Sequence, residues 1–351
     1  MKLTTLLETI SIAGATIFSF VLRKPKLLYF GAATYGNVGD LAISVASEKL
    51  LREKSSRKVI VINDSISVTT AKWLRHFINS KDVVAFQGGG NFGDLYPKIE
   101  GEREAVFTLV QPKNPVLIQM PTSINFENSN EINLQKIRAA YSNVNIFARE
   151  SYSFQNGHSM SLGQSLELVP DIVCSLVPQN SVKRHQQKKD SLKVLVIRRA
   201  DHERRENQLL DELIRSYESN PKVSLKYTDT VVDVPDLSVR STKKRQQIVN
   251  DKISEIAKAD IVVTDRLHGM LLSRVARIPV IAFDNSTHKI KHTVSDWLGD
   301  DQGVLFVNSS GDVKQSVIEE WYVNAVRDNR AVQFDFELLT NRLRFHTGVN
   351  G

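Results

Sequence analysis

An arginine and a histidine in the segment 259–272 stand where they can act on an anion. The apolar run 261–263 predicts a buried parallel strand, and Thr264 followed by leucines at helical spacing predicts a helix directly after it. In an open α/β sheet such a junction lies at the carboxyl edge, where ligands bind and a helix N-terminus favours anions. Arg266 and His268 add a fixed cation and a group that titrates near neutrality. The segment therefore predicts an anion site, with a surface arginine and a helix-capping histidine as the alternative.

Two glycine-rich segments follow predicted strands in the first half of the chain. Residues 36–40 follow a strand expected at 27–30, and residues 87–94, which include three successive glycines, follow a strand expected at 83–86. Successive glycines are costly in chain entropy, so they favour a backbone pressed against a ligand or against an opposing domain. For residues 36–40 a purely structural tight turn is the alternative.

Three further basic residues, Arg149, Arg198 and Lys289, also come at or shortly after the ends of predicted strands. Glu203 follows Arg198 closely and adds a carboxylate to an anion site there. Because the carboxyl ends of parallel strands meet at one edge of a sheet, these side chains can reach a common ligand. A surface salt bridge between Arg149 and Glu150, and a helix-start position for Lys289, are the alternatives.

The composition is that of an ordinary globular protein, with 41% hydrophobic and 24% charged residues. A net charge of +7 suits anionic ligands or an anionic membrane surface. Nucleic acid is disfavoured because the basic clusters 183–189 and 243–245 contain no interleaved aromatic residues. The single cysteine, Cys174, excludes an internal disulfide, fits a reducing cytoplasm and is expected in the core. No histidine or cysteine spacing typical of a metal site occurs, so we expect no metal.

The N-terminal segment 9–22 is mostly apolar and is followed by basic residues. It is too short to span a membrane and is interrupted upstream by Glu8. We expect a leading amphipathic helix, with a targeting segment or a membrane-surface anchor as the alternative.

Strand and helix patterns alternate along the rest of the chain, which predicts parallel sheets covered on both faces. At 351 residues the chain suits two domains. We expect a Rossmann-like domain over residues 1–176, a polar linker over 177–191, a second Rossmann-like domain over 192–330 and a C-terminal helix or tail over 331–351. The expected fold class is α/β, with two doubly wound parallel-sheet domains and an interdomain cleft.

Taken together, the motifs resemble the polysaccharide pyruvyl transferase family, in the family's order and at about its spacing. The matching residues are Gly36 to Asp40, Gln87 to Asn91, Arg149, Glu150, Ser153, Pro170, Asp171, Arg198, Arg266 to Gly269 and Lys289. One departure is Thr122, at a position where relatives often have glutamine. The family resembles two-domain glycosyltransferases of the GT-B type in fold.

The resemblance implies transfer of a pyruvyl group from phosphoenolpyruvate to two hydroxyls of a sugar in exopolysaccharide or cell-surface glycan biosynthesis. It implies a sugar or lipid-linked oligosaccharide acceptor, no cofactor, no nucleic acid, and a cytoplasmic location with contact at the inner membrane surface left open. The implied catalytic residues are His268, Arg149 and Lys289. The implied donor-binding residues are Arg198, Arg266, Leu267, Lys289 and Glu203. The implied acceptor-binding residues are Gly36, Asn37, Gly39, Asp40, Gly88, Gly89, Gly90 and Asn91.

Two rival functions remain compatible with these residues. A GT-B-type glycosyltransferase that uses a nucleotide sugar would share the fold and the anion site, and fold alone does not separate the two. A non-catalytic partner in polysaccharide assembly is the other, although such a protein would not need His268 and the arginines.

Overall fold

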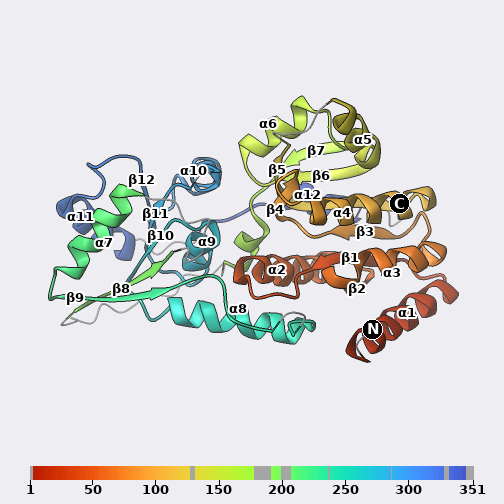
Figure 1. The fold of residues 1–351 in the computed structure, drawn as a ribbon, viewed down its shortest axis with the longest axis horizontal. Coiled ribbons are helices and arrows are strands. Elements are labelled where there is room, and N and C mark those ends of the chain that lie inside the picture. Colours follow the sequence, from red (N-terminus) through yellow and green to blue (C-terminus); the bar gives the residue numbers. More distant parts are fainter. Residues whose placement is uncertain are drawn as a thin grey trace.

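The computed structural model describes residues 3–126, 131–177, 191–198, 207–235, 238–285, 287–327 and 332–344. These residues form two all-parallel sheets flanked by helices, one from each half of the chain (Figure 1). The expected fold class of two doubly wound parallel-sheet domains is therefore confirmed.

The first sheet has the strand order β2-β1-β3-β5-β6-β7, with β4 paired to β5. Its strands are β1 (Lys26–Ala32), β2 (Lys58–Asn63), β3 (Val83–Phe86), β4 (Gly89–Gly93), β5 (Val116–Asn125), β6 (Val144–Ala148) and β7 (Ser165–Leu168). The helices of this half are α1 (Leu3–Val21), α2 (Val38–Lys54), α3 (Ser67–Leu74), α4 (Pro97–Val110), α5 (Glu131–Tyr141) and α6 (Ser151–Ser159), with the short helices η1 (Asp64–Ile66), η2 (Arg75–Phe77), η3 (Gln111–Lys113) and η4 (Ile172–Leu176). Every residue of β1, β3 and β6 is buried, as expected for strands covered on both faces.

The second sheet has the order β12-β11-β10-β8-β9. Its strands are β8 (Leu192–Ile197), β9 (Val223–Thr228), β10 (Ile261–Thr264), β11 (Val280–Phe283) and β12 (Val304–Val307). Its helices are α7 (Gln208–Glu218), α8 (Thr242–Ile256), α9 (Leu267–Val275), α10 (Lys289–Thr293) and α11 (Gln315–Arg327), together with a single π-helical segment η5 (Val294–Leu298). The last helix, α12 (Glu337–Arg344), packs on α2 of the first half.

Each sheet reverses its winding direction once, next to its first strand. In the first sheet the neighbours of β1 are β2 and β3, and in the second the neighbours of β8 are β9 and β10. Loops that leave adjacent strands at such a switch point diverge to opposite faces and leave a crevice at the carboxyl edge. The segments after β1 and β3, and those after β8 and β10, are among the segments that the sequence singled out.

The sequence predicts a loop over the glycine run 87–94, but five of these residues form strand β4 beside β5. The reason is close backbone approach. A Cβ on Gly88 would lie 2.0 Å from the carbonyl oxygen of Pro121, and one on Gly93 would lie 1.6 Å from that of Asn125. Gly93 also has a φ of +150°, which side chains disfavour. β12 is a second strand that the sequence did not indicate.

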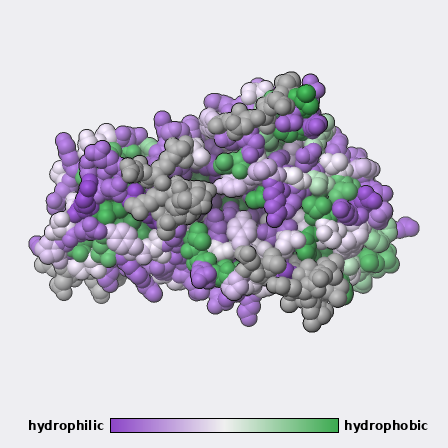
Figure 2. Space-filling model, in the orientation of Figure 1, coloured by the Kyte–Doolittle hydropathy of each residue, from purple (hydrophilic) through white to green (hydrophobic). Residues whose placement is uncertain are grey.

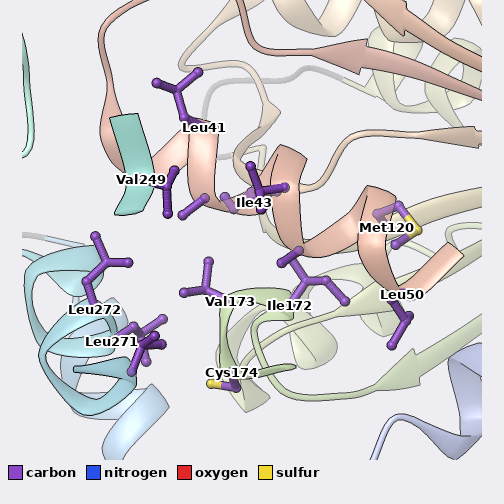
Figure 3. Packing of buried hydrophobic residues seen from close by; sticks show 14 of the residues in the cluster. Leu41, Ile43, Leu50, Met120, Ile172, Val173, Cys174, Val249, Leu271 and Leu272 are labelled. Carbon is purple, nitrogen blue, oxygen red and sulfur yellow. The ribbon is translucent and has the colours of Figure 1, made fainter. Parts of the chain in front are cut away.

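A single hydrophobic cluster joins the two halves. Apolar side chains of α2, of η4 and of the buried face of α9 pack against one another in this cluster. Val249 of α8 lies among them (Figure 3). Cys174 lies in this cluster at 3% exposure, as expected, and burial raises the pKa of its thiol well above the usual value. The apolar contact holds the carboxyl edges of the two sheets opposite one another.

The expected linker 177–191 falls almost entirely outside the described residues, so its boundaries stay a prediction. Within the described part of the chain, no helix is long and apolar enough to cross a membrane.

Candidate active site

The loop after β1 is bound to the second half of the chain by backbone hydrogen bonds. The amide of Val38 donates to the carbonyl of Thr230 at 2.7 Å, and the amide of Val232 donates to the carbonyl of Gly36 at 2.9 Å. A Cβ on Gly36 would lie 2.1 Å from the carbonyl oxygen of Val232. Gly36 is therefore needed for contact between the two halves. Asn37 caps α2 by accepting from the amide of Gly39.

His268, in the first turn of α9, faces this loop. A Cβ on Gly39 would lie only 2.2 Å from its Nδ1, so the glycine makes room for the imidazole ring. The other ring nitrogen, Nε2, is buried and has no hydrogen-bond partner among the residues that the structure describes. Its neighbour is Asp171, whose Oδ2 lies 3.7 Å away, which is ion-pair distance when the ring is protonated. A buried ring nitrogen without a partner is suited to proton transfer to a ligand.

Arg149, at the carboxyl end of β6, is held in a buried ion pair. Its Nη1 donates to Asp171 at 2.7 Å and its Nε donates to Ser123 at 2.9 Å. Arg149 and Asp171 are exposed by only 2% and 1%. Burial by itself raises the pKa of the Asp171 carboxyl, but the Arg149 guanidinium, His268 and the amide of Val173 together outweigh burial and hold that pKa well below its usual range. Asp171 therefore stays charged and connects Arg149 to His268.

Asp40, in the first turn of α2, is the second carboxylate of this group. Its Oδ2 accepts a hydrogen bond from the Tyr35 hydroxyl at 3.1 Å. Burial raises the pKa of Asp40, although His268 and Arg149 nearby oppose part of the shift. Two acids in one site thus have opposite shifts, which is typical of sites that accept and donate protons.

Lys289, in the first turn of α10, reaches across from the second half to the glycine run. Its Nζ is 3.5 Å from the carbonyl oxygen of Gly90. A Cβ on Gly90 would lie 3.1 Å from this Nζ and 3.4 Å from an Nη of Arg149. Gly90 therefore lies close to both cations. The sequence predicted that the glycine run packs against a ligand or against the opposing domain, and the structure shows contact with the opposing half.

The π-helical segment η5 binds the first half beside Arg149. The indole N–H of Trp297 donates to the carbonyl of Arg149 at 2.8 Å, and Asp296 accepts from the amide of Ser151 at 2.6 Å. The ring of Tyr152 stacks on His292 at 5.5 Å between centroids. These contacts fix the end of β6 relative to the second half. The sequence carried no signal for Asp296 or Trp297. Asp171 was among the residues that match the family's motifs but was assigned no role, although a carboxylate after a predicted strand could have been expected at this edge.

Arg198 and Arg266 lie together at the switch point of the second sheet. Nη1 of Arg198 pairs with Asp211 at 2.5 Å and its Nε lies 3.8 Å from Asp265, while Arg266 pairs with Asp229 at 2.7 Å. Nε and Nη2 of Arg198 are buried and have no hydrogen-bond partner in the described parts of the chain. The cations expected to bind the donor are thus divided between this pair and the Lys289–Arg149 group.

The remaining predicted site residues have other surroundings. The side chain of Leu267 is in the hydrophobic core, so only its backbone can face a ligand. Asn91 accepts from the buried guanidinium of Arg103 at 2.5 Å. The carbonyl of Gly89 accepts from Thr122 at 2.9 Å. Glu203 lies outside the described residues, and among the described ones no cluster of His, Cys, Asp or Glu is placed to hold a metal ion.

The close approach of Gly39 to His268 leads to a first prediction. In the Gly39→Ala variant the new methyl group would overlap the ring, so the ring must move away from Asp171. We expect the rate of the catalysed reaction to fall by about tenfold or more with little change in thermal unfolding. Gly14→Ala is the matched control, because a Cβ there meets no atom within 4 Å. Full activity of Gly39→Ala would contradict the placement of His268.

Two all-parallel α/β domains that meet at their carboxyl edges, with acids and cations gathered where the edges face, define a GT-B-like two-domain protein. The structure of S. aureus MnaA with UDP superposes with a TM-score of 0.51 over 92% of this chain and 96% of that chain, at 13% identity. That likeness concerns the fold alone.

The family model for polysaccharide pyruvyl transferase matches residues 37–287, and the chain belongs to this family. General stress protein 30 of Bacillus subtilis is 30% identical over 281 residues, which are 78% of this chain and 78% of that protein. Pyruvyl transferase 1 of Schizosaccharomyces pombe is 28% identical over 341 residues, covering 90% of this chain and 81% of the relative. The chain is therefore a transferase, and the resemblance drawn from its motifs is confirmed.

Proposed function

We propose that the protein transfers a pyruvyl group from phosphoenolpyruvate to two hydroxyls of a sugar and forms a ketal in a cell-surface glycan. The observation that carries the proposal is the convergence of His268, Arg149, Lys289, Asp171 and Asp40 where the two sheet edges meet. Membership of the polysaccharide pyruvyl transferase family supports a sugar acceptor.

The donor carries a phosphate and a carboxylate, so its site needs several positive charges. Arg149 and Lys289 approach Gly90 from opposite halves, and Arg198 and Arg266 lie at the second switch point. Arginine binds phosphate and carboxylate through two parallel N–H donors, and the N-terminus of α9 adds amide donors. We assign the donor to the second half, with its carboxylate or phosphate reaching Lys289. These cations can stabilise the departing phosphate, so the proposal includes no cofactor.

The chemistry follows from the enol phosphate of the donor. Protonation of the methylene carbon of phosphoenolpyruvate, with His268 as the acid, forms a methyl group and an oxocarbenium-like carbon. A sugar hydroxyl adds to that carbon and loses its proton. Loss of inorganic phosphate then regenerates the cationic centre, and a second hydroxyl closes the ketal. Overall one phosphoenolpyruvate and two hydroxyls give one ketal and one phosphate.

The acceptor is assigned to the first half, beside Gly39, Gly89 and Asp40. A hydroxyl that attacks the central carbon must lose a proton, and the raised pKa of Asp40 suits it to accept that proton. We therefore assign Asp40 as the base and His268 as the acid. The proposal also places the reaction in the cytoplasm, since phosphoenolpyruvate is a cytoplasmic metabolite and a chain with one cysteine suits a reducing compartment.

The test is incubation of the full chain with phosphoenolpyruvate and candidate lipid-linked sugars, followed by mass spectrometry of the acceptor and a phosphate assay. We expect a pyruvyl mass gain with one phosphate released per ketal. Calorimetry with nucleotide sugars is the parallel arm. Tight binding of a nucleotide sugar, together with glycosyl rather than pyruvyl transfer, would favour the glycosyltransferase alternative.

A second prediction concerns the affinity for the donor. The Arg266→Ala variant removes the guanidinium that pairs with Asp229 at the second switch point. We expect the dissociation constant for phosphoenolpyruvate to rise by about tenfold or more, because a charge-assisted hydrogen bond to the donor is lost. Titration calorimetry measures this, with Arg215→Ala on the exposed face of α7 as the control. Unchanged affinity would remove Arg266 from the donor site.

A further inference from the structure

The outward face of α1 is apolar. Exposed side chains on it include Ile10 at 57%, Phe18 at 62% and Val21 at 70%, and Ile17 and Leu22 lie between or beside them. At 100° per residue, Ile10, Ile17 and Val21 fall on one line along the helix and Phe18 lies about 80° to one side of it, while Leu22 follows the helix directly. Figure 2 shows hydrophobic surface over this end of the molecule, at the lower right.

The inward face of the same helix is partly polar. Thr16 is fully buried and Ser19 is 4% exposed, and each donates its hydroxyl hydrogen to a carbonyl of its own helix. Only Ile12 supplies a large buried aliphatic side chain among the side chains described for α1. A surface helix ordinarily buries its apolar stripe and exposes its polar one. Among its described side chains α1 exposes most of the large apolar ones, a pattern that marks an interaction surface.

Positive charge borders this apolar face. The exposed side chains of Arg23 and Lys24 follow the helix directly, and those of Lys72 and Arg75 lie on α3 and η2, against which α1 packs. Residues 10–24 contain no acidic residue. Apolar side chains with a basic border fit a bilayer that carries anionic headgroups. Two copies of the chain packed face to face would instead bring these like charges together.

We propose that α1 docks the protein on an anionic lipid surface. The helix lies in the interfacial plane, with Ile10, Ile17, Phe18 and Val21 among the acyl chains and Arg23 and Lys24 at the phosphates. This inference rests on the surface of α1 and not on the proposed reaction. It accounts for a helix that has its large apolar side chains on the outside and yet is not long and apolar enough to span a membrane.

The experiment is sedimentation of the full chain with vesicles of phosphatidylcholine and with vesicles that also contain phosphatidylglycerol. We expect binding to the anionic vesicles and weaker binding to the neutral ones, with loss of binding as salt is raised. The Phe18→Ser/Val21→Ser double variant should bind at least about tenfold more weakly, because two large apolar side chains leave the interface. The Arg23→Glu/Lys24→Glu variant should lose the preference for anionic vesicles.

Ile132→Ser on α5 is the matched control, because it removes an isoleucine that is 66% exposed on another helix. It should bind like wild type. All five substituted positions are at the surface, so unchanged circular dichroism is expected throughout. Failure of wild type to bind either vesicle, or equal binding by the Phe18→Ser/Val21→Ser variant, overturns the proposal. A stable dimer in light scattering that this variant disperses, without vesicle binding, shows that a second copy covers α1 and also overturns it.

Discussion

Replacement of His268 by alanine is expected to lower the rate of pyruvyl transfer by at least about 100-fold and to leave the fold and most of the donor affinity intact. The ring sits in the first turn of α9 against Gly39, with its Nε2 buried and 3.7 Å from Asp171. No other histidine is part of the Arg149–Asp171 group among the described residues. Without the ring, protonation of the methylene carbon depends on water. Single-turnover measurements with saturating phosphoenolpyruvate isolate this step.

The matched control is His158→Ala, which removes an exposed ring on α6 and should leave the rate unchanged. Calorimetric titration with phosphoenolpyruvate then separates binding from chemistry. A His268→Ala enzyme that keeps near-normal turnover would move the acid role to another group, with Glu203 as the next candidate. Lost affinity at unchanged turnover would instead make His268 a donor ligand.

Replacement of Arg149 by methionine is expected to abolish measurable transfer and to lower the free energy of unfolding by about 3–5 kcal/mol. The guanidinium is 2% exposed and pairs with Asp171 at 2.7 Å, while Glu150 lies 3.3 Å from its Nε. Methionine fills much of the same volume but leaves two buried carboxylates without their cation. Denaturant unfolding at neutral pH measures the loss, and the transfer assay measures the activity.

A second substitution separates charge from packing in this prediction. The Arg149→Met/Asp171→Asn variant also removes the negative charge of Asp171, which Arg149→Met leaves without its guanidinium partner. It should therefore recover part of the lost stability without recovering activity. The control pair is Arg342 and Glu167, which are 39% and 19% exposed and 2.6 Å apart. Arg342→Met should cost no more than about 1 kcal/mol. Equal costs for Arg149→Met and Arg342→Met would mean that the buried pair does not stabilise the fold.

Most of the strands and helices could be predicted from the local pattern of hydrophobic residues. Runs such as Val83–Phe86 and Val280–Phe283 are apolar throughout, and both are fully buried parallel strands in the structure. Such runs are readable because burial on both faces of a sheet depends mainly on the residues of the strand itself. The glycine run was harder to interpret, because Gly89 to Gly93 form a strand only beside the backbone of β5, which Gly88 and Gly93 approach closely and which lies far along the chain.

The basic residues and the histidine of the candidate site could likewise be named from the sequence. Basic residues and His268 after predicted strands indicated that these side chains gather at a sheet edge, because strand ends share an edge whatever the details of packing. Their action on a ligand stays a prediction. The ordered motifs also indicated the family, which the comparison confirms.

The pairing of these groups, by contrast, depends on the tertiary structure. Asp171 joins Arg149 to His268, Trp297 binds the carbonyl of Arg149, and Gly39 opens space for the imidazole. Each contact joins residues more than 20 positions apart, from different elements and mostly from different halves of the chain. Spacing along the sequence gives the face or edge on which a side chain lies. The partner across the interface depends on how two independently formed sheets pack, and no local pattern encodes that packing.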